Sequence, residues 1–308
     1  MLVNIVSNYN SINSEYISKT LSDIPETFAQ HARYIGSYAF YNFSYLSSVS
    51  FPNCISIGDS AFAYCKYLQT VSFPALEYIG SYAFSSCSSL TSVDFPNCSY
   101  IGSYAFRSCY SLTTINALNC SYIGSYAFTS CSSLTSVDFP NCTSIGNYAF
   151  WSCYSLITAN LPNCTSIGSY AFSNCYSLTT INASSCNYIG SYAFASCRSL
   201  TSVNTLNCRY IGIYAFGNCW SLTTANLPNC SFIGSYAFRS CYSLISLYLN
   251  PVSSVPTLDG TNVFLSTPIG GYSTSAGRYG SVFVPSSLYA SFLTAKNWSD
   301  ISARIVSV

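Results

Sequence analysis

Residues 123–128 read Ile-Gly-Ser-Tyr-Ala-Phe, and the pattern Ile-Gly-x-x-Ala-Phe occurs ten times in the chain at a constant interval of 22 residues. The copies run from Ile35 to Ile233 without insertion or deletion. A fixed period of this size is typical of a solenoid, in which each repeat buries its apolar face only against its neighbours. The sequence therefore predicts one stack of ten repeats over residues 33–250, with an N-terminal cap at 1–32 and a C-terminal cap at 251–308.

Each repeat carries one predicted strand. Residues Thr114–Ala117 alternate polar and apolar side chains, which favours a short strand with one buried face. Stacked in register, such strands form a parallel sheet of about ten short strands. The later pattern Ala-Phe-x-x-Cys-x-x-Leu has apolar residues three apart, which predicts a helical or 3₁₀ turn on the other face of the solenoid. The motif glycine indicates either a turn with positive φ or a close approach of two backbones.

The C-terminal segment has a pattern of its own. Val282–Val284 is a predicted strand, which Pro285 ends. A helix is expected to follow, N-capped by a serine of the pair Ser286 and Ser287. Its apolar residues are Leu288, Phe292 and Ala295. A segment of this kind would cover the apolar face and the open strand edges at the end of the solenoid, and both of these invite aggregation.

Charge is scarce in this chain. Only 6% of the residues are charged, the formal net charge is +1, and the ten Lys and Arg residues are scattered. Without a basic stripe, nucleic acid is not an expected partner. No apolar run approaches the ~18 residues of a membrane helix. The first residues also lack the basic and apolar regions of a secretory signal peptide.

The full repeat signature, Ile-Gly-x-x-Ala-Phe-x-x-Cys-x-x-Leu, resembles the BspA-like leucine-rich repeats of bacteria and protozoa. The resemblance implies a leucine-rich-repeat fold and a surface protein used in adhesion and host contact. The tail from Tyr279 to Trp298 looks like the C-terminal segment of such proteins from gut bacteria and their phages. The expected location is therefore a cell surface or, because no signal peptide is visible, a virion surface such as a phage tail.

The seventeen cysteines occupy two positions of the repeat, three residues after the motif Phe and three before the motif Ile. We interpret them as ladders of buried free thiols that act as small apolar side chains. Zinc is not expected, because ligand pairs normally lie about two to four residues apart, and these cysteines are never closer than 11. An odd number excludes complete disulfide pairing. Many free thiols indicate synthesis under reducing conditions, and no metal or other cofactor is expected.

Catalytic side chains are also scarce. His31 is the only histidine and lies in the predicted N-terminal cap, so no Ser-His-Asp or Cys-His arrangement can be built across the repeats. Asp94 and Asp138 share a strand column two repeats apart and offer too few oxygens for calcium. The Asn-x-Ser/Thr sequences fall mostly in one repeat column, where closing a turn is the preferred role over glycosylation. The chain is therefore not expected to be an enzyme.

Two columns of the repeat vary, whereas most others hardly change. They are the residue after the motif Phe and, three positions later, the residue after the following Cys. Residues three apart share a face of a helical turn, so side-by-side pairs are expected. The bulky pairs are Arg107–Tyr110, Trp151–Tyr154 and Arg239–Tyr242. Tyr, Trp and Arg dominate binding surfaces. The candidate binding residues are Arg107, Tyr110, Trp151, Tyr154, Tyr176, Arg198, Trp220, Arg239 and Tyr242.

Two functions remain open. The variable columns favour a non-catalytic recognition or adhesion protein that binds a cell-surface glycan or protein, with the contact between about residues 150 and 242. A third column, nearly all Tyr from Tyr38 to Tyr236, is expected to be partly exposed. The polar strand face, with Thr114 beside Asn116, is a second candidate for a glycan, although a solvated sheet is the preferred interpretation there. The alternative function is a purely structural solenoid that forms a spacer or a self-assembling fibre.

Overall fold

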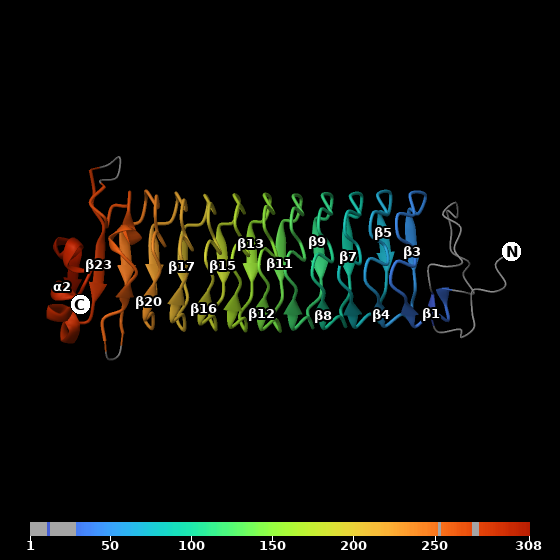
Figure 1. Cartoon of the computed structure of the whole chain (residues 1–308), viewed down its shortest axis with the longest axis horizontal. Helices are drawn as coiled ribbons and strands as arrows, with labels where there is room; N and C mark the ends of the chain where they lie inside the picture. The colour runs from blue at the N-terminus through green and yellow to red at the C-terminus, as the bar shows by residue number, and fades with distance from the viewer. Residues whose placement is uncertain (1–10, 13–28, 252–253, 273–276) are drawn as a thin grey trace. The chain divides into compact units, whose positions relative to one another are not determined.

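The computed structural model describes residues 11–12, 29–251, 254–272 and 277–308. The chain divides into two compact units, Met1–Leu156 and Ile157–Val308. Each unit is a stack of 22-residue coils, and each complete coil contributes two short strands (Figure 1). The predicted parallel solenoid is confirmed within each unit. The predicted N-terminal cap falls mostly on residues outside the described ranges.

The predicted strand is present in each coil as three residues. In the first unit the strands are β3 (Ser48–Ser50), β5 (Thr70–Ser72), β7 (Ser92–Asp94), β9 (Thr114–Asn116) and β11 (Ser136–Asp138). In the second unit they are β13 (Thr158–Asn160), β15 (Thr180–Asn182), β17 (Ser202–Asn204), β19 (Thr224–Asn226) and β21 (Ser246–Tyr248). Pairing is parallel and in register, so that Val93 of β7 lies beside Ile115 of β9. The central residue points inward and its neighbours point to solvent.

A second strand, which the sequence analysis did not predict, contains the motif Ile and the residue before it. In the first unit these strands are β2 (Tyr34–Ile35), β4 (Ser56–Ile57), β6 (Tyr78–Ile79), β8 (Tyr100–Ile101), β10 (Tyr122–Ile123) and β12 (Ser144–Ile145). In the second they are β14 (Ser166–Ile167), β16 (Tyr188–Ile189), β18 (Tyr210–Ile211) and β20 (Phe232–Ile233), and β22 (Thr257–Leu258) continues them with Leu258 at the Ile position. β1 (Ser11–Ile12) also pairs in parallel with β2. Two residues are too few to show the alternation that identifies a strand in a sequence.

The motif glycine allows successive coils to approach closely. A Cβ atom on Gly102 would lie 2.6 Å from the carbonyl carbon of Gly80 in the preceding coil. The motif glycines do not have positive φ; the glycines with positive φ are Gly260, Gly271 and Gly277. Of the two predicted reasons for this glycine, close backbone approach is therefore the one that applies.

Stacked phenylalanines form the centre of each unit. The rings of Phe62, Phe84 and Phe106 lie 5.2–5.3 Å apart with nearly parallel planes, and these three side chains are 0% exposed. Burying a side chain of this size contributes about 1.5–3 kcal/mol, whereas ordering each residue costs about 1–2 kcal/mol of backbone entropy. A single coil therefore cannot offset the cost of ordering its 22 residues, and the stack is the folding unit.

The C-terminal segment continues the sheet and then covers it. Its elements are η2 (Thr261–Phe264), β23 (Ser281–Val284), η3 (Ser286–Leu288), α2 (Tyr289–Thr294), η4 (Ser299–Arg304) and β24 (Ile305–Ser307). β23 pairs in parallel with β21 on one side and with β24 on the other. Phe264 stacks on Phe238 of the last repeat. Trp298 is fully buried and donates its ring N–H to the Pro256 carbonyl at 2.7 Å.

The predicted strand at Val282–Val284 is confirmed, but the predicted serine cap is wrong. Helix α2 begins after Leu288 and has no side-chain hydrogen bond at its N-terminus. Ser286 instead begins the 3₁₀ turn, and its backbone N–H donates to the Val308 carbonyl. Phe292 is buried in the helix as expected, whereas Ala295 already lies just past its end.

Candidate functional site

The segment that follows the motif glycine positions both variable columns. Its backbone N–H groups alternate between two kinds of acceptor. The N–H of Phe106 donates to Ala127 of the next coil at 2.7 Å, whereas that of Arg107 donates to Tyr104 three residues earlier at 3.1 Å. The segment is therefore tied both to itself and to its neighbour at almost every residue, which makes it a rigid base for the side chains that leave it.

This segment is a series of turns and differs from the expected helical turn. Tyr104 and Ser108 have φ of 60° and 59°, and the equivalent residues of the other repeats adopt the same left-handed conformation. An L-residue costs roughly 1–2 kcal/mol in that region, and the bonds to the next coil hold it there. Because Ser108 lies between Arg107 and Tyr110, the spacing rule for helix faces does not apply to this pair.

The tyrosines at the first left-handed position form a continuous ladder. Tyr82, Tyr104, Tyr126 and Tyr148 stack with ring centroids 4.5–4.6 Å apart and planes within 5° of parallel. In the second unit Tyr170 and Tyr192 stack in the same way at 4.6 Å. Desolvation beside these neighbours raises the pKa of Tyr82 and Tyr126 above its usual value. The column is partly exposed, as predicted: Tyr82 is exposed and the tyrosines from Tyr104 to Tyr236 are half-buried.

We call the residue after the motif Phe the first variable column. Its small members are buried: Ser85 and Thr129 are each 4% exposed. Its large members extend outward beside the tyrosine ladder. The Arg107 guanidinium carbon lies 5.8 Å from the centroid of the Tyr104 ring, and the Arg239 carbon lies 5.5 Å from that of Tyr236.

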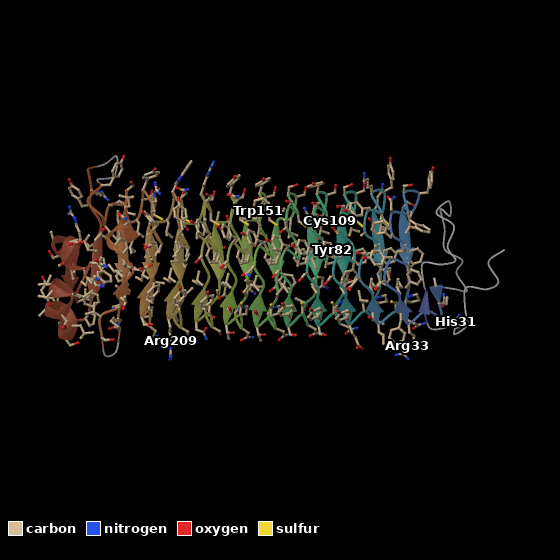
Figure 2. The ribbon with its side chains drawn as sticks, viewed as in Figure 1. His31, Arg33, Tyr82, Cys109, Trp151 and Arg209 are labelled. Atoms are coloured by element: carbon tan, nitrogen blue, oxygen red, sulfur yellow. The ribbon has the colours of Figure 1, made fainter. Side chains whose placement is uncertain are left out.

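Trp151 is half-buried and meets Tyr148 edge to face, with centroids 6.5 Å apart. Figure 2 shows it in the upper part of the coils. The large residues of the first variable column therefore pack on the tyrosine three residues before them.

We call the residue after the following Cys the second variable column. Its candidate residues Tyr110, Tyr154, Arg198, Trp220 and Tyr242 are exposed and Tyr176 is half-buried. The Arg198 guanidinium carbon lies between two rings, 4.6 Å from the centroid of Tyr176 and 4.4 Å from that of Trp220. Cation–π contacts of this kind stabilise by about 0.5–1 kcal/mol when exposed. Where large residues follow one another in this column, as at Tyr176, Arg198 and Trp220, they stack from one coil to the next.

A second aromatic ladder was missed by the sequence analysis. It lies on the short strands, at the residue before the motif Ile. Tyr78, Tyr100 and Tyr122 stack at 4.9 and 5.1 Å in the first unit. Tyr188, Tyr210 and Phe232 do so at 5.0 and 4.9 Å in the second. The signal was present as a Tyr-Ile dipeptide at one phase of the repeat, but without a predicted strand nothing indicated that its rings would stack.

The polar strand face consists largely of side chains bonded to one another. The Asn116 amide donates to the Asp94 carboxylate at 2.7 Å, and that of Asn182 donates to the Asn160 carbonyl oxygen at 2.7 Å. The Thr113 hydroxyl donates to the backbone carbonyl of Thr91 at 2.9 Å. Groups already engaged in this way have less capacity to bind a ligand, which agrees with the preferred interpretation of this face as a solvated sheet.

The cysteines and the turn asparagines have structural contacts. All seventeen cysteines are buried. Cys109, for example, donates its thiol to the Phe84 carbonyl at 3.1 Å. Burial raises the pKa of Cys65 and Cys98 to about 12. Asn119, part of an Asn-x-Ser sequence, donates its amide to the Pro96 carbonyl of the preceding coil at 2.8 Å. The cysteine contacts support the expected buried thiols, whereas Asn119 links two successive coils and does not close its own turn.

Groups for other chemistry are limited in the described part of the chain. No cluster of three or more His, Cys, Asp or Glu side chains is placed there to hold a metal ion. No helix among those same residues has the length and apolar character needed to cross a membrane.

Comparison with known proteins supports the fold. A family model described as "BspA type Leucine rich repeat region (6 copies)" matches residues 10–131 and 121–245. It describes a repeat rather than a catalytic domain. No curated protein sequence matches the chain.

Several solved structures resemble it. A leucine-rich repeat protein from Bacteroides ovatus is 23% identical with a TM-score of 0.67, over 97% of this chain and 87% of that one. The pneumococcal vaccine antigen PcpA is 16% identical with a TM-score of 0.51, over 90% and 70%. A leucine-rich cell surface protein from Faecalibacterium prausnitzii is 21% identical with a TM-score of 0.45, over 88% and 80%. At these identities the likeness concerns the fold alone.

Proposed function

We propose, from the premise that this chain belongs to the BspA-type leucine-rich repeat family, that it is a non-catalytic recognition protein. Its partner would be a glycan or protein on a cell surface, and the chain itself would be displayed on a bacterial cell or a phage particle. Surface adhesion and recognition are common roles in this family, and the partner and the place of display belong to the proposal.

One observation carries the proposal. Most of the exposed members of the two variable columns are Tyr, Trp or Arg. Tyr110, Tyr154, Trp220 and Tyr242 are 42–52% exposed. Exposed large aromatic side chains are costly to leave in water, and they dominate interface energies when a partner covers them. The backbone beneath them is held by bonds within and between coils, so little conformational entropy is lost on binding.

The contacts within the second variable column also support recognition. The stacking of Arg198 between Tyr176 and Trp220 holds three long side chains in one arrangement before any partner arrives. Pre-ordered side chains lose less rotamer entropy on association, which raises affinity without a new contact. A spacer would have no need for this order at exposed positions that sister repeats fill with Ser132 or Ser88.

The test is a binding measurement on the intact chain. Fluorescently labelled protein is applied to a glycan array and to bacterial and animal cells, with unlabelled protein as competitor. Recognition predicts saturable binding to a restricted set of glycans or cells, which the competitor removes. Filaments in electron micrographs, together with no saturable binding on any array or cell, would overturn the proposal in favour of the structural spacer or fibre.

A further inference from the structure

In three neighbouring coils of the first unit, both variable columns alternate between large and small residues. The first variable column reads Arg107, Thr129, Trp151, and the second reads Tyr110, Ser132, Tyr154. Among the ten repeats this is the one place where a coil with two small residues lies between two coils that each carry two large ones. Coil spacing is about 4.8 Å, so the large residues face each other across a small coil.

The small residues of the middle coil are held down against the backbone. Thr129 is 4% exposed, and its hydroxyl donates to the Tyr148 carbonyl at 2.7 Å. The Ser132 hydroxyl is directed to the Tyr110 carbonyl at 3.4 Å. Neither side chain therefore extends outward to the level of its large neighbours.

The large residues on either side are exposed at a defined spacing. Tyr110 and Tyr154 are 52% and 45% exposed. They occupy the same column two coils apart, which separates them by roughly 10 Å. Carbon atoms in contact lie about 3.5–4.0 Å apart, so a flat group held between two rings needs them about 7–8 Å apart. The spacing here is roughly 10 Å. A puckered saturated ring is thicker than a flat base and fits this wider spacing.

The second unit contains the same arrangement with its middle position filled. There Arg198 occupies the position that corresponds to Ser132, and its guanidinium group lies between the rings of Tyr176 and Trp220 at 4.6 and 4.4 Å. The column geometry thus accepts a group between rings two coils apart. At Ser132 the chain supplies no such group itself, because the serine side chain ends at its hydroxyl.

Charge indicates the chemistry of the ligand. Arg107 is exposed beside the small coil, in a chain of which only 6% is charged. A guanidinium group binds carboxylates with two parallel hydrogen bonds, and it repels an incoming cation. We propose that Tyr110, Ser132 and Tyr154 hold a pyranose ring whose carboxylate is bound by Arg107, that is, a sugar acid. This inference rests on the proposed recognition function and assigns it a ligand class and a site.

The test is an NMR chemical-shift titration of the intact chain, a method that measures weak binding and locates it. The probes are methyl β-glucuronide and methyl β-glucoside, which differ in the carboxylate alone. Wild-type protein is expected to bind the glucuronide about tenfold more tightly, the scale of one charge-assisted contact. Shifts should centre on residues 107–110, 129–132 and 151–154.

Two substitutions separate the ring site from the charge. Ser132→Tyr fills the middle coil with the residue that the column holds at Tyr110 and Tyr154, so folding should be unaffected and binding of both sugars lost. Ser88→Tyr makes the same change in the same column outside the site, and binding should remain. Arg107→Gln should remove the preference for the glucuronide and leave glucoside binding in place.

Three results would overturn the sugar-acid site: no saturable shifts with either sugar, unchanged binding in Ser132→Tyr, or tighter binding of a flat probe such as adenosine. The Ser132→Tyr variant is also applied to the cells that wild-type protein recognises. If the variant still attaches to them, recognition stands and uses another surface, and the site proposed here is refuted. Failure of wild-type protein to attach to any cell or glycan refutes the proposed function itself.

Discussion

At the scale of single residues, burial decides the behaviour of the thiols. Cys109 and its equivalents lie in the centre of the coil and donate to a carbonyl of the preceding coil. Desolvation raises the pKa of Cys54 to about 11 and that of Cys98 to about 12, against an ordinary value of about 8.5. The sequence predicted buried free thiols from the repeat position alone, because a slot filled elsewhere by Phe43 or Leu76 is apolar.

Stability should therefore fall at alkaline pH. Above about pH 9 the cysteines of the unfolded chain lose protons while those of the folded chain keep theirs, so folding is penalised by ~1.4 kcal/mol per pH unit for each such thiol. The loss begins above the unfolded pKa and continues up to the folded one. Urea unfolding with a reductant present, from about pH 7 to pH 10, measures it.

The control is Cys98→Ala, which should be less stable at neutral pH and show a shallower loss at alkaline pH. Thiol titration should count close to seventeen groups after denaturation and far fewer in the folded protein. A folded chain that reacts completely within the same time, or a variant with the same alkaline slope as wild-type protein, would contradict this account.

At the scale of the elements, the sequence predicted the strands whose side chains alternate between polar and apolar. It missed the strands that are too short to show this alternation. Thr114–Asn116 could be recognised from its pattern, whereas Tyr122–Ile123 is too short to have one. The segment that follows the motif glycine was expected to be helical because its apolar residues lie three apart. It is not helical, because its tyrosines adopt the left-handed conformation and hydrogen bonds to the next coil hold them there. In one of these bonds the backbone N–H of Tyr104 donates to the Ser125 carbonyl at 2.9 Å. No propensity scale predicts Tyr at positive φ.

The tyrosine ladder should stabilise the turns by more than the left-handed backbone costs. Tyr126 stacks on Tyr104 and Tyr148 at 4.6 Å, and each such contact contributes about 0.5–1.5 kcal/mol. Tyr126→Gly relieves the backbone but loses both contacts, so we expect the free energy of unfolding to fall by about 1 kcal/mol. Chemical denaturation measures the change.

Ser60→Gly is the matched control, because Ser60 has φ of 54° in the same column but carries no ring. Glycine tolerates the left-handed backbone, which stabilises the folded state, but its greater freedom in the unfolded chain favours unfolding. The two effects nearly cancel at Ser60, so the free energy of unfolding should change by less than about 0.5 kcal/mol. If both substitutions have equal effects, the stacked rings contribute nothing and the ladder is a by-product of the repeat.

At the scale of the whole molecule, the periodicity of the sequence predicted the fold. It did not predict how the side chains of the candidate surface contact one another. The large members of the variable columns are exposed or half-buried. Their contacts were not predicted: Arg107 and Arg239 lie over ladder tyrosines, and Arg198 lies between residues of its own column. Those contacts depend on backbone conformation and on neighbouring coils, which the order of residues within one repeat does not reveal.

The C-terminal segment should be required for a soluble protein. β23 pairs with β21, β22 pairs with β20, and Phe264 stacks on Phe238. Deletion of residues 251–308 would expose those strand edges and the apolar end of the coil, and exposed edges of this kind pair with other chains. Expression and size-exclusion chromatography should therefore show insoluble or aggregated protein. A soluble monomeric truncation would show that the segment is not a cap.

The central claim is that the variable columns bind the partner, and attachment to a recognised cell or glycan tests it most directly. The variant combines Trp151→Ser, Tyr154→Ser, Trp220→Ser and Tyr242→Ser, and sister repeats already hold small residues at these slots. Its control replaces four exposed tyrosines outside the columns by serine: Tyr34, Tyr45, Tyr67 and Tyr279. Exposed substitutions usually change stability by less than about 0.5 kcal/mol each. The account predicts that attachment is lost in the first variant and kept in the control, with similar melting temperatures. Attachment that survives in the first variant, or a collapse of its melting temperature, would contradict it.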